Sequence, residues 1–168
     1  MWQRMLQGGS GGSGTLDKIE LIKDGVPNFA LTYSNQNANV TQSNNQMVIT
    51  STVGGSGSPN SGKLSWDIDC DKISRIVAEN VKQASYERTT IGIASSIGSS
   101  DLSSMSWDYN FATSGSGIGG SGVPINNTNY DVDVSSIGLT GNKMLILAVH
   151  KSSVSSPLYI QNLTVYLK

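Results

Sequence analysis

His150 is the only histidine in this chain of 168 residues, so any triad of serine, histidine and aspartate would have to use it. It ends an apolar run in which alternate residues are expected to point to opposite faces of a strand. We therefore expect a histidine on a polar face or at a sheet edge rather than a catalytic base. Zinc is excluded as a closed site of histidine and cysteine ligands, because the chain has one of each.

Two glycine-rich stretches come close to nucleotide-binding motifs. The stretch Gly57–Lys63 nearly spells a phosphate-binding loop, but Leu64 follows the lysine where Ser or Thr would reach magnesium. Gly115, Gly117 and Gly120 have the dinucleotide spacing, yet no helix follows them to receive a pyrophosphate. Both stretches are predicted to be ordinary loops.

Aspartates at alternate positions of the run Asp67–Asp71 resemble the opening of a calcium loop. That loop requires Gly next and Glu at its twelfth position, where this chain has Lys72 and Ala78. A helix-loop-helix calcium site is therefore excluded. A jelly roll can still hold calcium through carboxylates at a sheet end. The candidates for such a site are Asp101, Asp131 and Asp133. We expect no other metal and no organic cofactor.

The binding candidate is a stretch in which aromatic and polar residues alternate. Trp107, Tyr109 and Phe111 would lie on one face of a strand, with Asp108 and Asn110 on the other. If the aromatic face is exposed, its rings form a platform on which sugar rings stack, and Asp108 or Asn110 accepts hydroxyl hydrogen bonds at its rim. The alternative is that all three rings fill the core.

The composition favours a neutral polar surface. Only 14% of the residues are charged, 37% are hydrophobic and the net charge is -1, which argues against a nucleic-acid partner. No apolar stretch is long enough for a signal peptide or a membrane span, so membrane insertion is not expected. The single cysteine, Cys70, is predicted to be a buried free thiol. A glycan is the ligand class that best matches this surface.

Strand signals recur between clusters of Gly, Pro, Asn and Ser from Leu16 onward. The expected strands are 18–23, 28–33, 46–53, 63–69, 75–86, 89–95, 104–112, 130–135, 144–151 and 158–167. About ten strands separated by such turn-forming clusters predict two packed antiparallel sheets, that is, a jelly roll or β-sandwich. The apolar residues of Arg75–Ser85 could also form the stripe of a short helix, although their β-branched content favours a strand.

Alternation within the strands predicts one buried face and one solvated face. Leu64, Trp66 and Ile68 share a face, and the same phase recurs in Tyr130–Ser135. The last strand keeps this phase only if a bulge near Asn162 resets its register.

The first fifteen residues are predicted to lie outside the sandwich. Trp2, Arg4, Met5 and Leu6 belong to a short sticky peptide, and a Gly/Ser tether follows it up to Gly14. The peptide is either an anchor that docks into a partner or an added expression leader. The sequence thus predicts residues 1–15 as anchor and linker and residues 16–168 as one jelly-roll domain.

The run Tyr130–Ser135, with Thr140–Asn142, Met144–Leu147 and the closing Leu158–Tyr166, resembles the C-terminal half of known jelly-roll domains. These are domains of tailed-bacteriophage virion proteins and carbohydrate-binding modules. The tethered leader resembles the attachment segments of phage accessory proteins. The resemblance implies a non-catalytic virion protein, assembled in the host cytoplasm, at the capsid as a decoration or fibre, or at the tail tip or baseplate.

Under this hypothesis the leader attaches the chain to other virion proteins and the β domain adheres to host-surface or mucosal glycans. Many copies on one particle, as a homo-oligomer, would gain avidity from weak single sites. The alternative hypothesis is an isolated carbohydrate-binding module of a larger secreted enzyme that acts on glycosides. No set of acid, base and nucleophile supports a hydrolase.

Overall fold

A computed structural model describes residues 17–53, 61–83, 89–98, 105–114, 123–124, 128–150 and 157–168. All regular elements in these residues are β-strands. They are β1 (Lys18–Lys23), β2 (Val26–Pro27), β3 (Tyr33–Gln36), β4 (Ala38–Ser43), β5 (Gln46–Ser51), β6 (Ser61–Asp69), β7 (Ile73–Gln83), β8 (Thr89–Ala94), β9 (Tyr109–Ser114), β10 (Val123–Pro124), β11 (Thr128–Asp133), β12 (Asn142–His150), β13 (Leu158–Ile160) and β14 (Asn162–Leu167).

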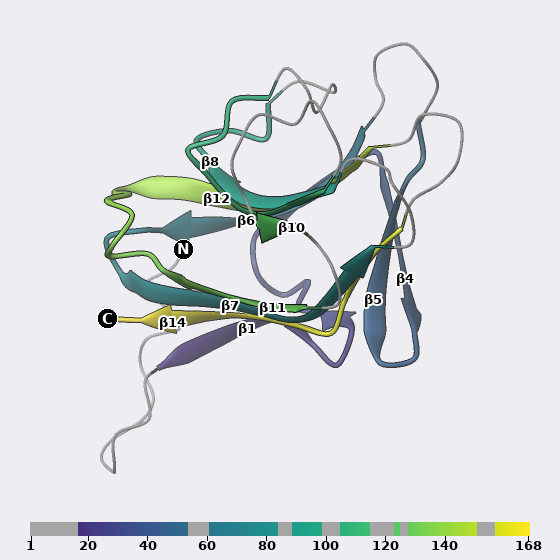
Figure 1. Ribbon diagram of the computed structural model, residues 1–168, viewed down its shortest axis with the longest axis horizontal. Coiled ribbons are helices and arrows are strands. Elements are labelled where there is room, and N and C mark those ends of the chain that lie inside the picture. Colours follow the sequence, from purple (N-terminus) through teal and green to yellow (C-terminus); the bar gives the residue numbers. More distant parts are fainter. Residues whose placement is uncertain are drawn as a thin grey trace.

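The strands form two facing sheets, which confirms the all-β sandwich. The smaller, six-stranded sheet has the order β10-β9-β8-β12-β6-β3. The larger, eight-stranded sheet has the order β2-β1-β14-β7-β13-β5-β4, with β11 paired to β7. Figure 1 shows β8, β12 and β6 in the upper layer and β7, β11, β14 and β1 in the lower one. All these pairings are antiparallel except that of β10 with β9, which is parallel.

The main core lies between the sheets and includes residues from both. Trp66 is its largest fully buried side chain, and Leu147 of the neighbouring β12 is also fully buried. Cys70 lies in this core as a free thiol, as expected, and burial raises its pKa. A raised thiol pKa keeps Cys70 neutral and therefore a poor nucleophile.

The larger sheet bends where an irregular residue of β7 lies beside the gap between β13 and β14. Asn80 in β7 has a left-handed φ of 51°, and opposite it Gln161 separates β13 from β14. The amide Nδ2 of Asn80 donates to Oε1 of Gln161 over 3.1 Å. In Figure 1, β5 and β4 stand upright beside the horizontal β7 and β14. The irregularity expected near Asn162 is therefore the break at Gln161 that separates β13 from β14.

Most strand positions were predicted, but the short strands β2 and β10 and the edge strands β3 and β4 were not. Of the strand expected at 28–33, residues 28–32 form a turn and only Tyr33 is in a strand, because Pro27 and Asn28 direct the chain from β2 toward β3. β4 was missed because Ala38 and Val40 are its only apolar residues, which is too short a pattern to indicate a strand from the sequence. The strand expected from Ser104 begins only at Tyr109. The segment that could have been helical is strand β7.

His150 lies on β12, which is flanked by β8 and β6 on its two sides. The histidine is therefore in the interior of the smaller sheet rather than at its edge, and it is buried. No helix in the described part of the chain has the length and apolar character needed to cross a membrane.

Candidate functional site

A second apolar cluster covers the outer face of the smaller sheet. Its buried residues are Ala94, Met105, Ile146 and Ala148, and the half-buried Trp107 and Met144 pack against it. Residues of β12 thus alternate between this cluster and the main core, which explains why the whole strand is apolar. The chain after β8 returns over this face and brings Trp107 to it.

Lys63 fastens the connection between β8 and β9 to the sheet. Its side chain is fully buried on β6, and its Nζ donates to the carbonyl oxygen of Ile97 over 3.2 Å. Ala148 is the direct cross-strand neighbour of both Lys63 and Thr90, so a small side chain lies between β6 and β8 at this level. Lys63 of β6 therefore holds Ile97, which follows β8, although β12 lies between these two strands.

Gly92 lets the indole of Trp107 lie against β8. A Cβ added at Gly92 would be 2.8 Å from Cε3 of Trp107 and 2.5 Å from Oδ1 of Asn110, which is too close for any side chain. Nε1 of Trp107 is buried and has no hydrogen-bond partner among the described residues. The ring is thus fixed by packing against the sheet, and part of the side chain stays accessible.

A polar triad lies at the same end of the sheet, where β8 ends, β12 begins and the chain enters β9. Lys143 Nζ donates to Ser95 Oγ over 2.8 Å and to Asp108 Oδ2 over 3.2 Å. The Ser95 hydroxyl donates to Asp108 Oδ2 over 2.8 Å. The Lys143 and Asp108 side chains are 18% and 30% exposed, so solvent molecules can still reach both. Trp107 directly precedes Asp108 in the chain and packs against the same apolar cluster as Met144, the neighbour of Lys143 on β12.

The predicted platform of three aromatic rings does not form. Tyr109 packs against the main core, and Phe111 is buried there with its ring centroid 6.3 Å from that of Tyr130. Trp107 lies before the strand and packs against the other cluster. Asn110 is buried and faces Gly92. Asn110 and Phe111 are thus buried, whereas Trp107, Asp108 and Tyr109 keep accessible surface.

The calcium candidates in the described residues do not fit a metal site. Arg75 binds both carboxylate oxygens of Asp131, one of them over 2.6 Å, and this hydrogen bonding lowers the pKa of Asp131. Asp133 accepts from the backbone N–H of Ser135 and Ser136 and caps its own turn. The described residues contain no cluster of three acidic, histidine or cysteine side chains. Asp101 lies outside them.

The proposed anchor residues Trp2, Arg4, Met5 and Leu6 also lie outside the described residues. Their role stays a prediction.

One pair of exposed rings was not predicted from the sequence. Phe29 is 49% exposed and Tyr33 is 39% exposed, and their ring centroids are 4.7 Å apart. The signal that could have revealed them is the absence of any charged residue or histidine from Gly25 to Gly62, together with the turn-forming Pro27 and Asn28.

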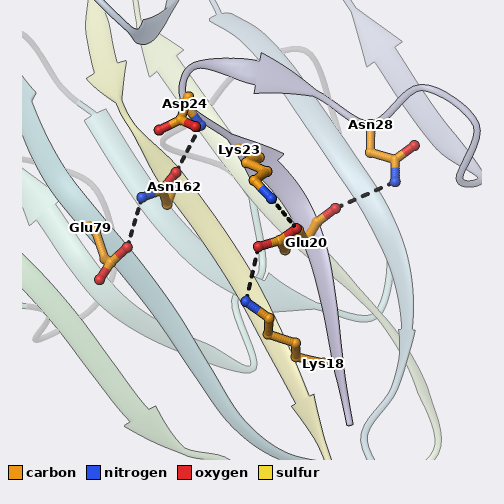
Figure 2. Close-up of polar contacts among 7 residues, drawn as sticks. All are labelled: Lys18, Glu20, Lys23, Asp24, Asn28, Glu79 and Asn162. Carbon is orange, nitrogen blue, oxygen red and sulfur yellow. Dashed lines mark hydrogen bonds and ion pairs between the residues drawn. The ribbon is translucent and has the colours of Figure 1, made fainter.

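Charged side chains surround the base of this turn on the outer face of the larger sheet (Figure 2). Glu20 binds Lys18 over 3.0 Å and Lys23 over 3.2 Å, and hydrogen bonds from Lys18 and then Lys23 lower the pKa of Glu20. Asn162 joins two further elements, because its Oδ1 accepts from the N–H of Asp24 and its Nδ2 donates to Glu79. The carboxylates of Glu20 and Glu79 are thus both engaged by neighbouring side chains.

Comparison with known proteins supports the fold. No family model matches the chain, and neither does the sequence of any curated protein. A solved carbohydrate-binding module of family 29 superimposes with a TM-score of 0.51 and 12% identity, over 90% of this chain and 89% of that chain. CBM86, a low-affinity xylan-binding module from the gut symbiont Roseburia intestinalis, superimposes with a TM-score of 0.43 and 11% identity, over 92% and 97% of the two chains. The chain has a β-sandwich like that of carbohydrate-binding modules.

Proposed function

We propose that this domain is a non-catalytic glycan-binding module. The proposal is carried by the half-buried Trp107, which directly precedes Asp108 of the polar triad in the chain. An indole ring offers a flat apolar surface to the C–H face of a sugar, and the triad offers both donors and acceptors to its hydroxyls. The fold shared with a carbohydrate-binding module of family 29 supports the same ligand class.

The test is affinity electrophoresis of the intact chain in gels that contain xylan, glucomannan, mixed-linkage β-glucan or mucin. We expect retardation by at least one of them. Trp107→Ala should weaken that binding roughly tenfold, which corresponds to about 1.4 kcal/mol. Asp108→Asn, which keeps the shape and removes the charge, should weaken it less.

Tyr159→Ala is the matched control. Tyr159 is a half-buried aromatic residue of the larger sheet, where Lys82 Nζ lies 4.8 Å from its ring centroid. This variant should bind like the wild type. Equal binding by Trp107→Ala and the wild type would overturn the assignment of the site.

For the biological setting, we propose display on a virion through the N-terminal peptide. The support is the leader of Trp2, Arg4, Met5 and Leu6 on its Gly/Ser tether, and the resemblance to phage accessory proteins. Pull-down of phage capsid and tail subcomplexes with the intact chain should fail for a chain without residues 1–14. Equal behaviour of the two chains would favour the alternative, a module detached from a larger secreted enzyme.

A further inference from the structure

The exposed rings Phe29 and Tyr33 lie where the chain passes from one sheet to the other. β2 is the edge strand of the larger sheet and β3 is the edge strand of the smaller sheet. The segment between them therefore spans one open side of the sandwich. Val26 at its start is 54% exposed, so three large apolar side chains are accessible along this short stretch.

The turn that presents Phe29 is held in place by its backbone. The N–H of Asn28 donates to the carbonyl of Leu21 on β1 over 2.8 Å, and the N–H of Leu31 donates to the carbonyl of Asn28 over 3.3 Å. Oδ1 of Asn28 accepts from the N–H of Ala30 over 3.2 Å. Leu31 packs against the main core. Because the turn is fixed before any ligand arrives, binding there costs little conformational entropy.

The two rings cover the edge of the core, but this role explains only part of their placement. Tyr33 is the cross-strand partner of Trp66, so one side of its ring covers the end of the core. Phe29 covers Tyr33 in turn, with an interplanar angle of 40°. Half of Phe29 nevertheless faces solvent, although a smaller side chain would close the edge without that exposure. An exposed apolar patch of this kind marks a contact surface.

The segment that carries the two rings is uncharged, and Glu20 pairs with Lys18 and Lys23 at the base of the turn, which indicates a neutral ligand rich in hydroxyl groups. No residue from Gly25 to Gly62 is charged, and ten of them are Asn or Gln. A nucleic acid or an anionic membrane would require basic side chains here. Ser34 and Asn28 are exposed beside the rings and can bond to hydroxyls. Apolar faces with hydroxyl edges are the chemistry of pyranose rings.

We infer that Phe29 and Tyr33 form a second contact site for neutral glycans, separate from Trp107. β8, β12 and β6 lie between β9, which Trp107 precedes, and β3, which begins at Tyr33. The inference rests on the proposed function, because it assumes that the domain binds glycans. It makes the domain bivalent, so that one copy contacts two sugar segments and gains avidity without a partner.

Two-dimensional NMR titration of the full chain with xylohexaose, mannohexaose and cellohexaose tests the inference. We expect at least one sugar to shift two separate groups of signals, the amides of residues 28–35 and the indole of Trp107. Phe29→Leu keeps an apolar side chain but removes the ring, so it should abolish the first group of shifts and leave the second. The same variant should weaken binding to the matching polysaccharide roughly tenfold.

A variant with stronger glycan binding completes the experiment. Phe29→Trp enlarges the ring at the same half-exposed position and should strengthen binding several-fold. Val26→Ala is the control, because it removes an exposed apolar side chain that is not aromatic. Thermal unfolding of each variant shows that it is folded.

The outcomes separate the two proposals. Sugar-induced shifts confined to the Trp107 indole would overturn the second site and leave the proposed function standing. Shifts confined to residues 28–35 would support the second site and overturn the first. Shifts at residues 28–35 that grow with protein concentration in the absence of sugar would identify a contact between copies of the chain and overturn the inference. No shift with any of the three sugars would overturn the second site, and the absence of retardation in every polysaccharide and mucin gel as well would overturn the proposed function.

Discussion

Gly92 controls how closely the Trp107 indole can approach the smaller sheet. A methyl group there would come within 3 Å of the indole and of the Asn110 amide, and within 2.7 Å of the backbone oxygen of Tyr109. We therefore expect Gly92→Ala to displace the ring and to weaken glycan binding about as much as Trp107→Ala, roughly tenfold. Affinity electrophoresis beside an NMR spectrum of the indole N–H measures both effects.

Gly138→Ala is the comparison for this variant. Gly138 has a φ of 69° but nothing within 4 Å of an added Cβ, so the change strains the backbone without touching Trp107. It should lower stability and leave glycan binding intact. If both glycine variants lost binding in proportion to stability, the close packing of Trp107 would not be what positions the ring.

Single residues show what sequence patterns can and cannot predict about the site. Trp107 and Asp108 were predicted because ring and carboxylate are adjacent in the chain. Lys143 and Ser95 were not, since they reach Asp108 from 35 and 13 residues away and only the pairing of β8, β9 and β12 brings them together. The exposure of Phe29 likewise depends on how Leu31 anchors its turn, which no local pattern encodes.

The hairpin of β4 and β5 is an element in which two residues determine the geometry. Asn44 and Asn45 have φ values of 51° and 59°, as a two-residue type I′ turn requires. Asn45→Val should lower the free energy of unfolding by about 1 kcal/mol, because a β-branched residue is strained at positive φ. Asn45→Gly should preserve or raise it. Urea unfolding measures both changes.

Asn39→Ala serves as the control for the hairpin. Asn39 is exposed on β4 and is not among the residues with positive φ, so its replacement should change stability little. A loss as large as that of Asn45→Val would mean that β4 contributes through its side chains rather than its turn.

Strands with alternating apolar residues were predictable, and those at edges were not. The alternation predicted β6 and β14, but the expected solvated face of β6 is partly covered, because Lys63 and Ser65 are buried. β4 pairs only with β5 and carries just two alternating apolar residues, Ala38 and Val40, so the sequence signal for a strand is weak. The bend of the larger sheet was only partly anticipated, because it combines the positive φ of Asn80 with the break at Gln161, which is distant from it in sequence.

At the scale of the whole molecule, the free energy of unfolding should decrease at low pH. Hydrogen bonding to Lys72 lowers the pKa of Asp69, and hydrogen bonding to Arg75 lowers that of Asp131. A carboxyl group whose folded pKa is lowered stabilises the fold above its unfolded pKa, about 3.9, and loses this contribution as the pH falls through the folded value. We expect stability to be level from about pH 5 upward and to fall steadily below about pH 4.

Urea unfolding at a series of pH values checks this expectation. Lys72→Gln removes the partner of Asp69 and should flatten the acid slope slightly, since both groups are at the surface and solvent screens the pair. An acid slope identical to that of the wild type would show that the pair contributes nothing to the pH dependence.

The larger sheet cannot be completed while the ribosome still holds residues 157–168. β13 joins β5 to β7, and β14 joins β7 to β1, so these twelve residues hold the sheet together. A nascent chain therefore emerges with several strand edges vacant and completes this sheet only after residues 157–168 have left the ribosome. For the same reason the domain is suited to division into two pieces. One piece would lack residues 157–168, and a peptide of those residues would complete its larger sheet on addition.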